Sequence, residues 1–165
     1  MSNRFQTTLF SKVDRTKDPD FFVRFMDEGH KLPAIQASKR LMLERIALAP
    51  GESVLDVGCG PGIDVLDMVE LVGPAGRLVG LDASEVMIAE ARRRAKELHV
   101  PIAFDVGEVQ ALPFPDDTFD VCRAERLLMH VTDAGRALTE MVRVTRPGGR
   151  VAIFDFDWDT LIIDH

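Results

Sequence analysis

The residues best suited to bind a small polar ligand lie in the stretch VLDVGCGPG, residues 54–62. An apolar run ends near Asp56, and three glycines follow within five residues: Gly58, Gly60 and Gly62. Glycine permits positive φ angles and lets a backbone approach a ligand closely. The next apolar residues keep helical spacing: Ile63, Leu66, Val69 and Val72. This order predicts a strand, a tight turn and a helix whose first N–H groups are free to face a ligand.

A second candidate binding residue is Asp82, which ends the next apolar run, residues 78–81. It follows the glycines by about 20 residues, where nucleotide-binding folds place an acid on the ribose hydroxyls. The alternative is a strand-end aspartate that caps the helix beginning after Ser84.

A dinucleotide site is the rival interpretation of the glycine stretch. The fingerprint G-x-G-x-x-G needs a glycine where Ile63 stands, and the third glycine falls at Gly62 instead. The chain also contains no tyrosine, so it lacks the Tyr and Lys pair of many nicotinamide enzymes. Both observations disfavour an NAD-dependent oxidoreductase.

Four stretches resemble, in the right order, the class I S-adenosylmethionine-dependent methyltransferases: VLDVGCGPG, GLDAS with Met87, GEVQALPFPDDTFD and RPGGRVAIFDF. They span residues 54 to 157 and look most like the branch that includes quinone-biosynthesis and other small-molecule methyltransferases. The resemblance implies S-adenosylmethionine as cofactor and methyl transfer to a small-molecule acceptor.

The resemblance also implies a role for individual residues. Asp56 would order the loop and help hold the methionine amino group, Asp82 would bind the ribose, and Met87 would pack against the adenine or serve as plain core. Glu108, where the family usually has Asp, would accept from the adenine amine beside the backbone N–H of Val109. The implied cofactor site consists of Asp56, Gly58, Cys59, Gly60, Gly62, Asp82, Ala83, Met87, Glu108, Val109 and Arg123.

Several charged residues leave alternatives open. Arg123 to His130 follow the fourth predicted strand, where the family faces the reactive methyl group. Arg123, Glu125 and Arg126 either contact ligands or pair with one another, and His130 is either a base or a capping or core residue. The residues Asp155, Asp157 and Asp159 resemble the start of a calcium loop but lack its glycine and terminal glutamate, so we expect no metal site.

Alternating strand and helix signals from Ser53 onward predict an α/β fold, a mostly parallel sheet with helices on both faces. The strands are expected at 53–57, 77–82, 102–106, 119–124 and 149–156, with the Rossmann-like sheet order 3-2-1-4-5. Helices are expected over 31–48, from Ser84, and from Thr132 to a stop at Pro147. The apolar residues expected to face the core of these helices are Ile35, Leu41, Met42, Ile46, Ile88, Ala91, Ala95, Leu98, Ala134, Ala137, Leu138, Met141 and Val142.

Two parts are expected along the chain. Residues 1–50 combine phenylalanines that pack at intervals with the helix 31–48, which the resemblance implies is a lid. Residues 51–165 form the cofactor-binding core. Lys39 and Arg40 on the lid helix either reach the cofactor carboxylate or form a surface pair.

Composition excludes other classes of protein. The formal net charge of −7 disfavours nucleic-acid binding, and no apolar run reaches the ~20 residues that span a bilayer. The first residues also lack the apolar run of a signal peptide, so we expect a cytoplasmic protein. Only two cysteines occur, Cys59 and Cys122, which predicts small apolar residues and no disulfide framework.

The resembled family has two further strands after the fifth, and the sequence stops short of them. Val151, Ile153 and Phe154 would then lie on an uncovered edge strand, which predicts self-association through that edge. The alternatives to an active enzyme are a truncated or non-catalytic cofactor-binding or partner protein and, less favoured, the oxidoreductase.

Overall fold

Five parallel strands form one sheet in the order β3-β2-β1-β4-β5 in the computed structural model, which describes residues 9–155. The strands are β1 Ser53–Val57, β2 Arg77–Asp82, β3 Ala103–Val106, β4 Phe119–Glu125 and β5 Thr145–Phe154. The predicted fold class and strand order are confirmed. The predicted residues 156, Asp157 and Asp159 lie outside the described part.

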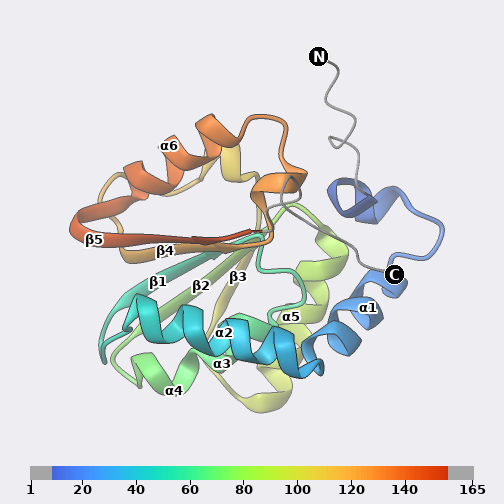
Figure 1. The fold of residues 1–165 in the computed structure, drawn as a ribbon, viewed down its shortest axis with the longest axis horizontal. Helices are drawn as coiled ribbons and strands as arrows, with labels where there is room; N and C mark the ends of the chain where they lie inside the picture. The colour runs from blue at the N-terminus through green and yellow to red at the C-terminus, as the bar shows by residue number, and fades with distance from the viewer. Residues whose placement is uncertain (1–8, 156–165) are drawn as a thin grey trace, which may run out of the picture.

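The α-helices cover both faces of the sheet (Figure 1). Their bounds are α1 Asp20–His30, α2 Pro33–Ile46, α3 Ile63–Asp67, α4 Val69–Val72, α5 Glu85–Leu98 and α6 Ala134–Val144. Three short 3₁₀ segments are η1 Leu9–Arg15, η2 Val109–Ala111 and η3 Leu128–His130. Figure 1 shows α6 on one side of the sheet and α2, α3, α4 and α5 on the other. No helix among the described residues is long and apolar enough to cross a membrane.

Each face of the sheet has its own apolar core because successive strand residues point to opposite faces. Val54 and Val121 face α2, α3, α4 and α5, and pack there with Met42, Ile46, Val65 and Met68. Leu55, Val57, Cys122 and Ala124 face α6, and pack there with Ala137, Met141 and Val144. Strands β1 and β4 are therefore buried on both faces, as is usual for the central strands of a parallel sheet.

The fifth strand begins earlier than predicted. β5 starts at Thr145, so Pro147 and Gly149 belong to the strand segment instead of ending the preceding helix, which stops at Val144. Its pairing with β4 jumps from Phe119↔Thr145 to Val121↔Arg150. This irregularity accommodates Pro147, which has no N–H to donate to a ladder.

Some predicted core positions are wrong because the helices contact the sheet along narrower stripes than the apolar pattern suggests. The side chains concerned are exposed to the following fractions: Leu41 53%, Leu98 61%, Leu138 36% and Val142 61%. After the glycine loop, the expected continuous helix is divided at Met68 into α3 and α4. Val65 and Met68 are fully buried there, whereas Ile63 and Leu66, which set the predicted helical spacing, are half-buried.

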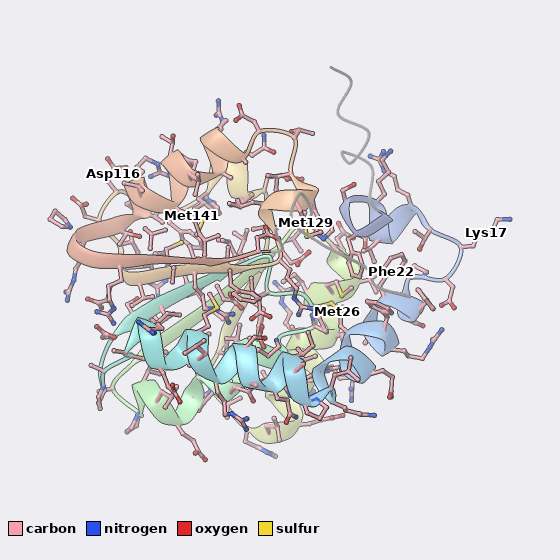
Figure 2. The ribbon with its side chains drawn as sticks, in the orientation of Figure 1. Lys17, Phe22, Met26, Asp116, Met129 and Met141 are labelled. Atoms are coloured by element: carbon pink, nitrogen blue, oxygen red, sulfur yellow. The ribbon has the colours of Figure 1, made fainter. Side chains whose placement is uncertain are left out.

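The N-terminal segment contains a helix that was not predicted, α1, in addition to α2, which lies within the predicted range 31–48. Phe22 on α1 packs with Val13 and Met87, and Met26 lies against this cluster. Phe21 and Phe25 are about half exposed, so the apolar residues of this helix do not follow a single buried face. Figure 2 shows Phe22 and Met26 on the side of α1 that faces the domain.

Candidate functional site

The glycine loop follows β1 at the carboxyl end of the sheet. Gly58, Gly60 and Gly62 have φ angles of 70°, 54° and 80°, which L residues rarely adopt. A Cβ at Gly60 would lie 2.7 Å from the Met26 Cε atom, and one at Gly62 would lie 3.0 Å from Phe104. The predicted tight turn is confirmed, and a side chain at either position would have to displace its neighbours.

The N–H groups that were expected to be free belong to the first turn of α3, whereas four N–H groups of the loop itself donate within the chain. Gly58 and Cys59 donate to the carbonyl of Leu81 at 2.7 and 3.1 Å, and Gly62 donates to the carbonyl of Cys59. Gly60 donates to the Asp82 carboxylate at 2.9 Å. The end of β2 therefore holds the loop in shape from within the chain.

Asp82 connects the loop to the start of α5. One carboxylate oxygen accepts from Gly60 and the other accepts from the Ser84 N–H at 2.9 Å. The Ser84 hydroxyl, rather than Asp82, caps α5 by accepting from the Met87 N–H at 3.2 Å. Burial raises the pKa of Asp82, and its two backbone hydrogen bonds oppose that rise. A carboxylate accepts about four hydrogen bonds, so Asp82 retains acceptor capacity for a ligand.

A buried cluster of charged side chains lies on the α2 and α3 side of β1 and β4. Arg123, 2% exposed, has its Nη2 atom 2.8 Å from Glu125 and 3.5 Å from Asp64. Its Nη1 atom lies 3.5 Å from Asp56 and has no hydrogen-bond partner. Arg126 lies 3.2 Å from Glu125, so the predicted ion network of Arg123, Glu125 and Arg126 is confirmed.

Lys39 belongs to this cluster, contrary to the expected surface pair with Arg40. Its Nζ atom donates to Asp64 and lies 3.5 Å from Glu125, and its side chain is 10% exposed. Lys39 therefore fastens α2 to α3 and β4 and forms no surface pair with Arg40.

The two aspartates of the cluster have opposite pKa shifts. Burial raises the pKa of Asp56 to about 7, although Arg123 opposes the rise. Burial also raises the pKa of Asp64, but Arg123 and Lys39 outweigh it and hold that pKa below its ordinary value. Of these two aspartates, Asp56 is therefore the one whose pKa lies near neutral pH.

The residues predicted to surround the adenine divide into two groups. Ala83 and Glu108 are exposed at neighbouring strand ends, where Gly107 donates to the Asp82 carbonyl at 2.9 Å. The side chains of Met87 and Val109 are 2% and 5% exposed and pack in separate apolar clusters. The structure thus brings Asp82, Ala83 and Glu108 to one edge, while the contacts of Met87 and Val109 with adenine stay predictions.

Neither cysteine is suited to nucleophilic chemistry. Cys59 and Cys122 are both buried and free, as predicted. Burial raises the pKa of both thiols, so the reactive thiolate is disfavoured.

His130 lies in η3, beyond the carboxyl end of β4. Its ring stacks on Phe10 with 5.4 Å between centroids, and burial lowers its pKa. A neutral imidazole at pH 7 is compatible both with a base and with a packing residue, so both interpretations of His130 stay open.

Asp155, the one aspartate within the described residues among the three predicted without a metal role, and a separate trio of side chains bear on cation binding. Asp155 accepts from the Met129 N–H at 3.2 Å. Within the described part, ligand atoms of His30, Asp64 and Asp67 lie within 4.8 Å of one another. Asp64 already pairs with Lys39 and Arg123, which disfavours a further cation there.

Sequence reasoning missed three residues of the site. Asp64, in the first turn of α3, completes the charged cluster, and its position directly after the glycine loop was a usable signal. Asp14 contacts the start of α5 through Ser84, and Met26 lies over Gly60. Nothing in the local pattern around Asp14 or Met26 indicates these contacts.

The arrangement defines a doubly wound domain with a preformed glycine loop and a carboxylate at the end of β2. Strand ends beside a reversal of strand order are where such sheets bind ligands. The acceptor capacity left on Asp82 fits a nucleoside cofactor with ribose hydroxyls.

Comparison with known proteins identifies the family. The model of a family described as a methyltransferase domain matches residues 48–164. The chain belongs to this family, and the predicted class, the class I S-adenosylmethionine-dependent methyltransferases with that cofactor, is confirmed.

One relative and two solved structures illustrate the similarity. The 2-phytyl-1,4-naphtoquinone methyltransferase of Synechocystis sp. is 38% identical over 120 residues, which are 72% of this chain and 50% of that protein. A SAM-dependent methyltransferase from Aquifex aeolicus has a TM-score of 0.67 at 27% identity, covering 71% of this chain and 63% of that one. The [4+2]-cyclase SpnF has a TM-score of 0.68 at 32% identity, and the match covers 73% of this chain and 44% of that one. The chain spans about half the length of the first curated relatives that it matches.

Proposed function

We propose that this domain binds S-adenosylmethionine and transfers its methyl group to a small-molecule acceptor. The observation that carries the proposal is the Asp82 carboxylate, which holds the glycine loop through Gly60 and keeps acceptor capacity for ribose hydroxyls. The quinone methyltransferase among the relatives supports an acceptor of that general kind, a small aromatic molecule.

Each site residue has a proposed role in binding. Asp82 accepts from the ribose hydroxyls, and Glu108 accepts from the adenine amine. Asp56 supports the loop beneath the amino-acid part of the cofactor, and Arg123 fixes Asp56 in place. The remaining proposed contacts are made by Gly58, Cys59, Gly60, Gly62, Ala83, Met87 and Val109.

The cofactor supplies an activated methyl group, so the protein mainly has to align the acceptor and exclude water. Positioning of this kind contributes effective molarities of about 10⁵ M or more. We infer that residues 1–50 form an N-terminal segment and a lid helix that excludes water, and that residues 51–165 form the cofactor-binding core. In support, α1 packs on Met87 and lies against Gly60, and Lys39 of α2 is fastened to Asp64. We place the protein in the cytoplasm.

Cofactor identity is the direct test. S-adenosylmethionine and S-adenosylhomocysteine are expected to bind with micromolar affinity or better, about −8 kcal/mol, and NAD far more weakly. Isothermal titration calorimetry on the 165-residue chain measures all three. NAD binding as tight as that of S-adenosylmethionine would reject the proposal.

Turnover then separates an enzyme from a binding protein. Methylation of small phenols and quinols, followed with a labelled methyl group, is the expected result. Cofactor binding without turnover on any of them would favour the cofactor-binding partner protein or a different reaction, since one similar structure is that of a [4+2]-cyclase.

We further propose that the domain self-associates through β5. In the described sheet β5 pairs with β4 on one side only, and Val151 and Ile153 on β5 are 36% and 40% exposed. The exposed Leu138 and Val142 of α6 are also apolar, and Val142 and Val151 line the same open groove. Unpaired backbone groups beside apolar side chains favour pairing with a second strand.

Val151→Lys is expected to keep the chain monomeric, because a charge on the edge strand opposes pairing. Sedimentation velocity over a range of concentrations should show association of the unmodified chain and none of this variant. Leu98→Lys, at a 61% exposed position on α5, is the control and should associate normally. A monomeric unmodified chain at every concentration would contradict the proposal.

A further inference from the structure

Asp14, in η1, closes the N-terminal end of α5 from a part of the chain 70 residues away. Its carboxylate accepts from the Ser84 hydroxyl and from the backbone N–H groups of Glu85, at 2.8 Å, and Val86, at 3.4 Å. These are orphan donors of the first helical turn. Asp14 therefore satisfies groups that Ser84, occupied with the Met87 N–H, leaves open.

Ser84 stands between Asp14 and the proposed ribose-binding carboxylate. Its hydroxyl donates to Asp14, while its backbone N–H donates to Asp82 at 2.9 Å. Asp82 in turn accepts from Gly60 at 2.9 Å. One continuous hydrogen-bonded path thus connects the N-terminal segment, the start of α5, the end of β2 and the glycine loop.

The N-terminal segment is fastened at a second place close to the same loop. Val13, next to Asp14, is 3% exposed and packs with Phe22 and Met87. Met26 extends from α1 to Gly60. Its Cε atom would lie 2.7 Å from a Cβ built on that glycine. The N-terminal segment therefore contacts the glycine loop through Met26, and it reaches Asp82 at the end of β2 through Asp14 and Ser84.

The negative charge of Asp14 has two opposite effects at this position. Asp14 and Glu108 both lie near enough to Asp82 to raise its pKa as like charges. The charge of Asp14 is unfavourable to the Asp82 carboxylate, but it is favoured by the N-terminal end of α5, whose N–H groups donate to it.

We propose that Asp14 is a positioning residue that couples docking of the N-terminal segment, residues 9–30, to cofactor binding at Asp82. This inference rests on the proposed function. With the segment docked, Ser84 and Asp82 are held in the geometry that receives the ribose, and the bound cofactor in turn holds the segment down. Coupling between two sites is reciprocal, so each event must favour the other to the same extent.

The test compares Asp14→Ala, Asp14→Asn and a control, Asp18→Ala, with S-adenosylhomocysteine as the probe. Asp18 is a nearby exposed acid that accepts from Phe21 and pairs with Arg24 but does not contact α5. Calorimetry gives the dissociation constant of each protein. Limited digestion with trypsin, which cuts at Lys12, Arg15 and Lys17, reports docking of the segment with and without the probe.

Asp14→Ala should bind the probe about tenfold more weakly, in line with the loss of a helix cap, and the probe should no longer protect the segment from trypsin. Asp14→Asn should restore most of both properties, because asparagine caps helices about as well as aspartate. Asp18→Ala should match the unmodified chain. Ser84 still caps Met87 in each variant, so the core is expected to stay folded.

Three results would overturn the inference, and they are distinguishable. Equal affinity of Asp14→Ala and the unmodified chain would make Asp14 a helix cap without coupling. Equal weakening by Asp18→Ala would show a general loosening of the segment, with no special role for Asp14. An unmodified chain that binds no probe would reject the proposed function itself, and the coupling with it.

Discussion

Asp82→Ala is expected to weaken binding of S-adenosylmethionine by about 10- to 150-fold. Hydrogen bonds to a charged group contribute about 1.5–3 kcal/mol, and each 1.4 kcal/mol is a tenfold change in affinity. The structure adds a second reason, because the same carboxylate holds Gly60 and Ser84. The substitution therefore removes the ribose acceptor and also releases the loop beside it.

Two further variants separate these effects. Asp82→Asn keeps the shape and one acceptor oxygen for the loop but loses the charge, so it should retain the fold and still bind the cofactor weakly. Asp105→Ala removes an exposed acid from the neighbouring strand β3 and should bind normally. Calorimetry gives the affinities and thermal unfolding the stability. An unchanged dissociation constant in folded Asp82→Ala would mean that Asp82 only shapes the loop.

The parts of the structure that the sequence predicted correctly depend on short-range patterns. The glycine turn follows from Gly58, Gly60 and Gly62, and the strand ends at Val57 and Asp82 follow from apolar runs that stop at polar residues. These signals lie within a few residues of one another, so they predicted the sheet and the edge where the site lies.

The parts that were missed depend on contacts between distant residues. Lys39 meets Asp64 across 25 positions and Asp14 meets Ser84 across 70. A lysine on a helix is normally solvated, and only the approach of α2 to α3 makes Lys39 an internal partner. The exposed Val142 is the opposite case, since an apolar pattern alone does not say how wide a stripe its helix buries.

Arg123→Met is expected to lower the free energy of unfolding by about 3–5 kcal/mol, the usual effect of removing one partner from a buried ion cluster. The methionine side chain fills much of the space, but Asp56, Asp64 and Glu125 lose the guanidinium that lies among them. Urea denaturation measures the loss. Arg93→Met is the control, because Arg93 pairs with Glu90 and Glu97 on the exposed face of α5 and its loss should leave the stability nearly unchanged.

The pH dependence of that loss separates lost charge balance from lost packing. Burial raises the pKa of Asp56 to about 7 even beside Arg123, and without the guanidinium that pKa rises further. An aspartate titrates near 3.9 in the unfolded chain, so between that value and the folded pKa the native state binds more protons than the unfolded state. Stability of the variant must then increase as the pH falls from 8 to 5.5. Asp64 acts in the same direction, because loss of Arg123 removes one of the charges that lower its pKa, while Lys39 remains. The difference in the free energy of unfolding between the unmodified chain and Arg123→Met should therefore be clearly smaller at pH 5.5 than at pH 8. An equal loss of stability at both pH values would mean that Arg123 acts through packing against Met42, and that the charged cluster does not explain the stability.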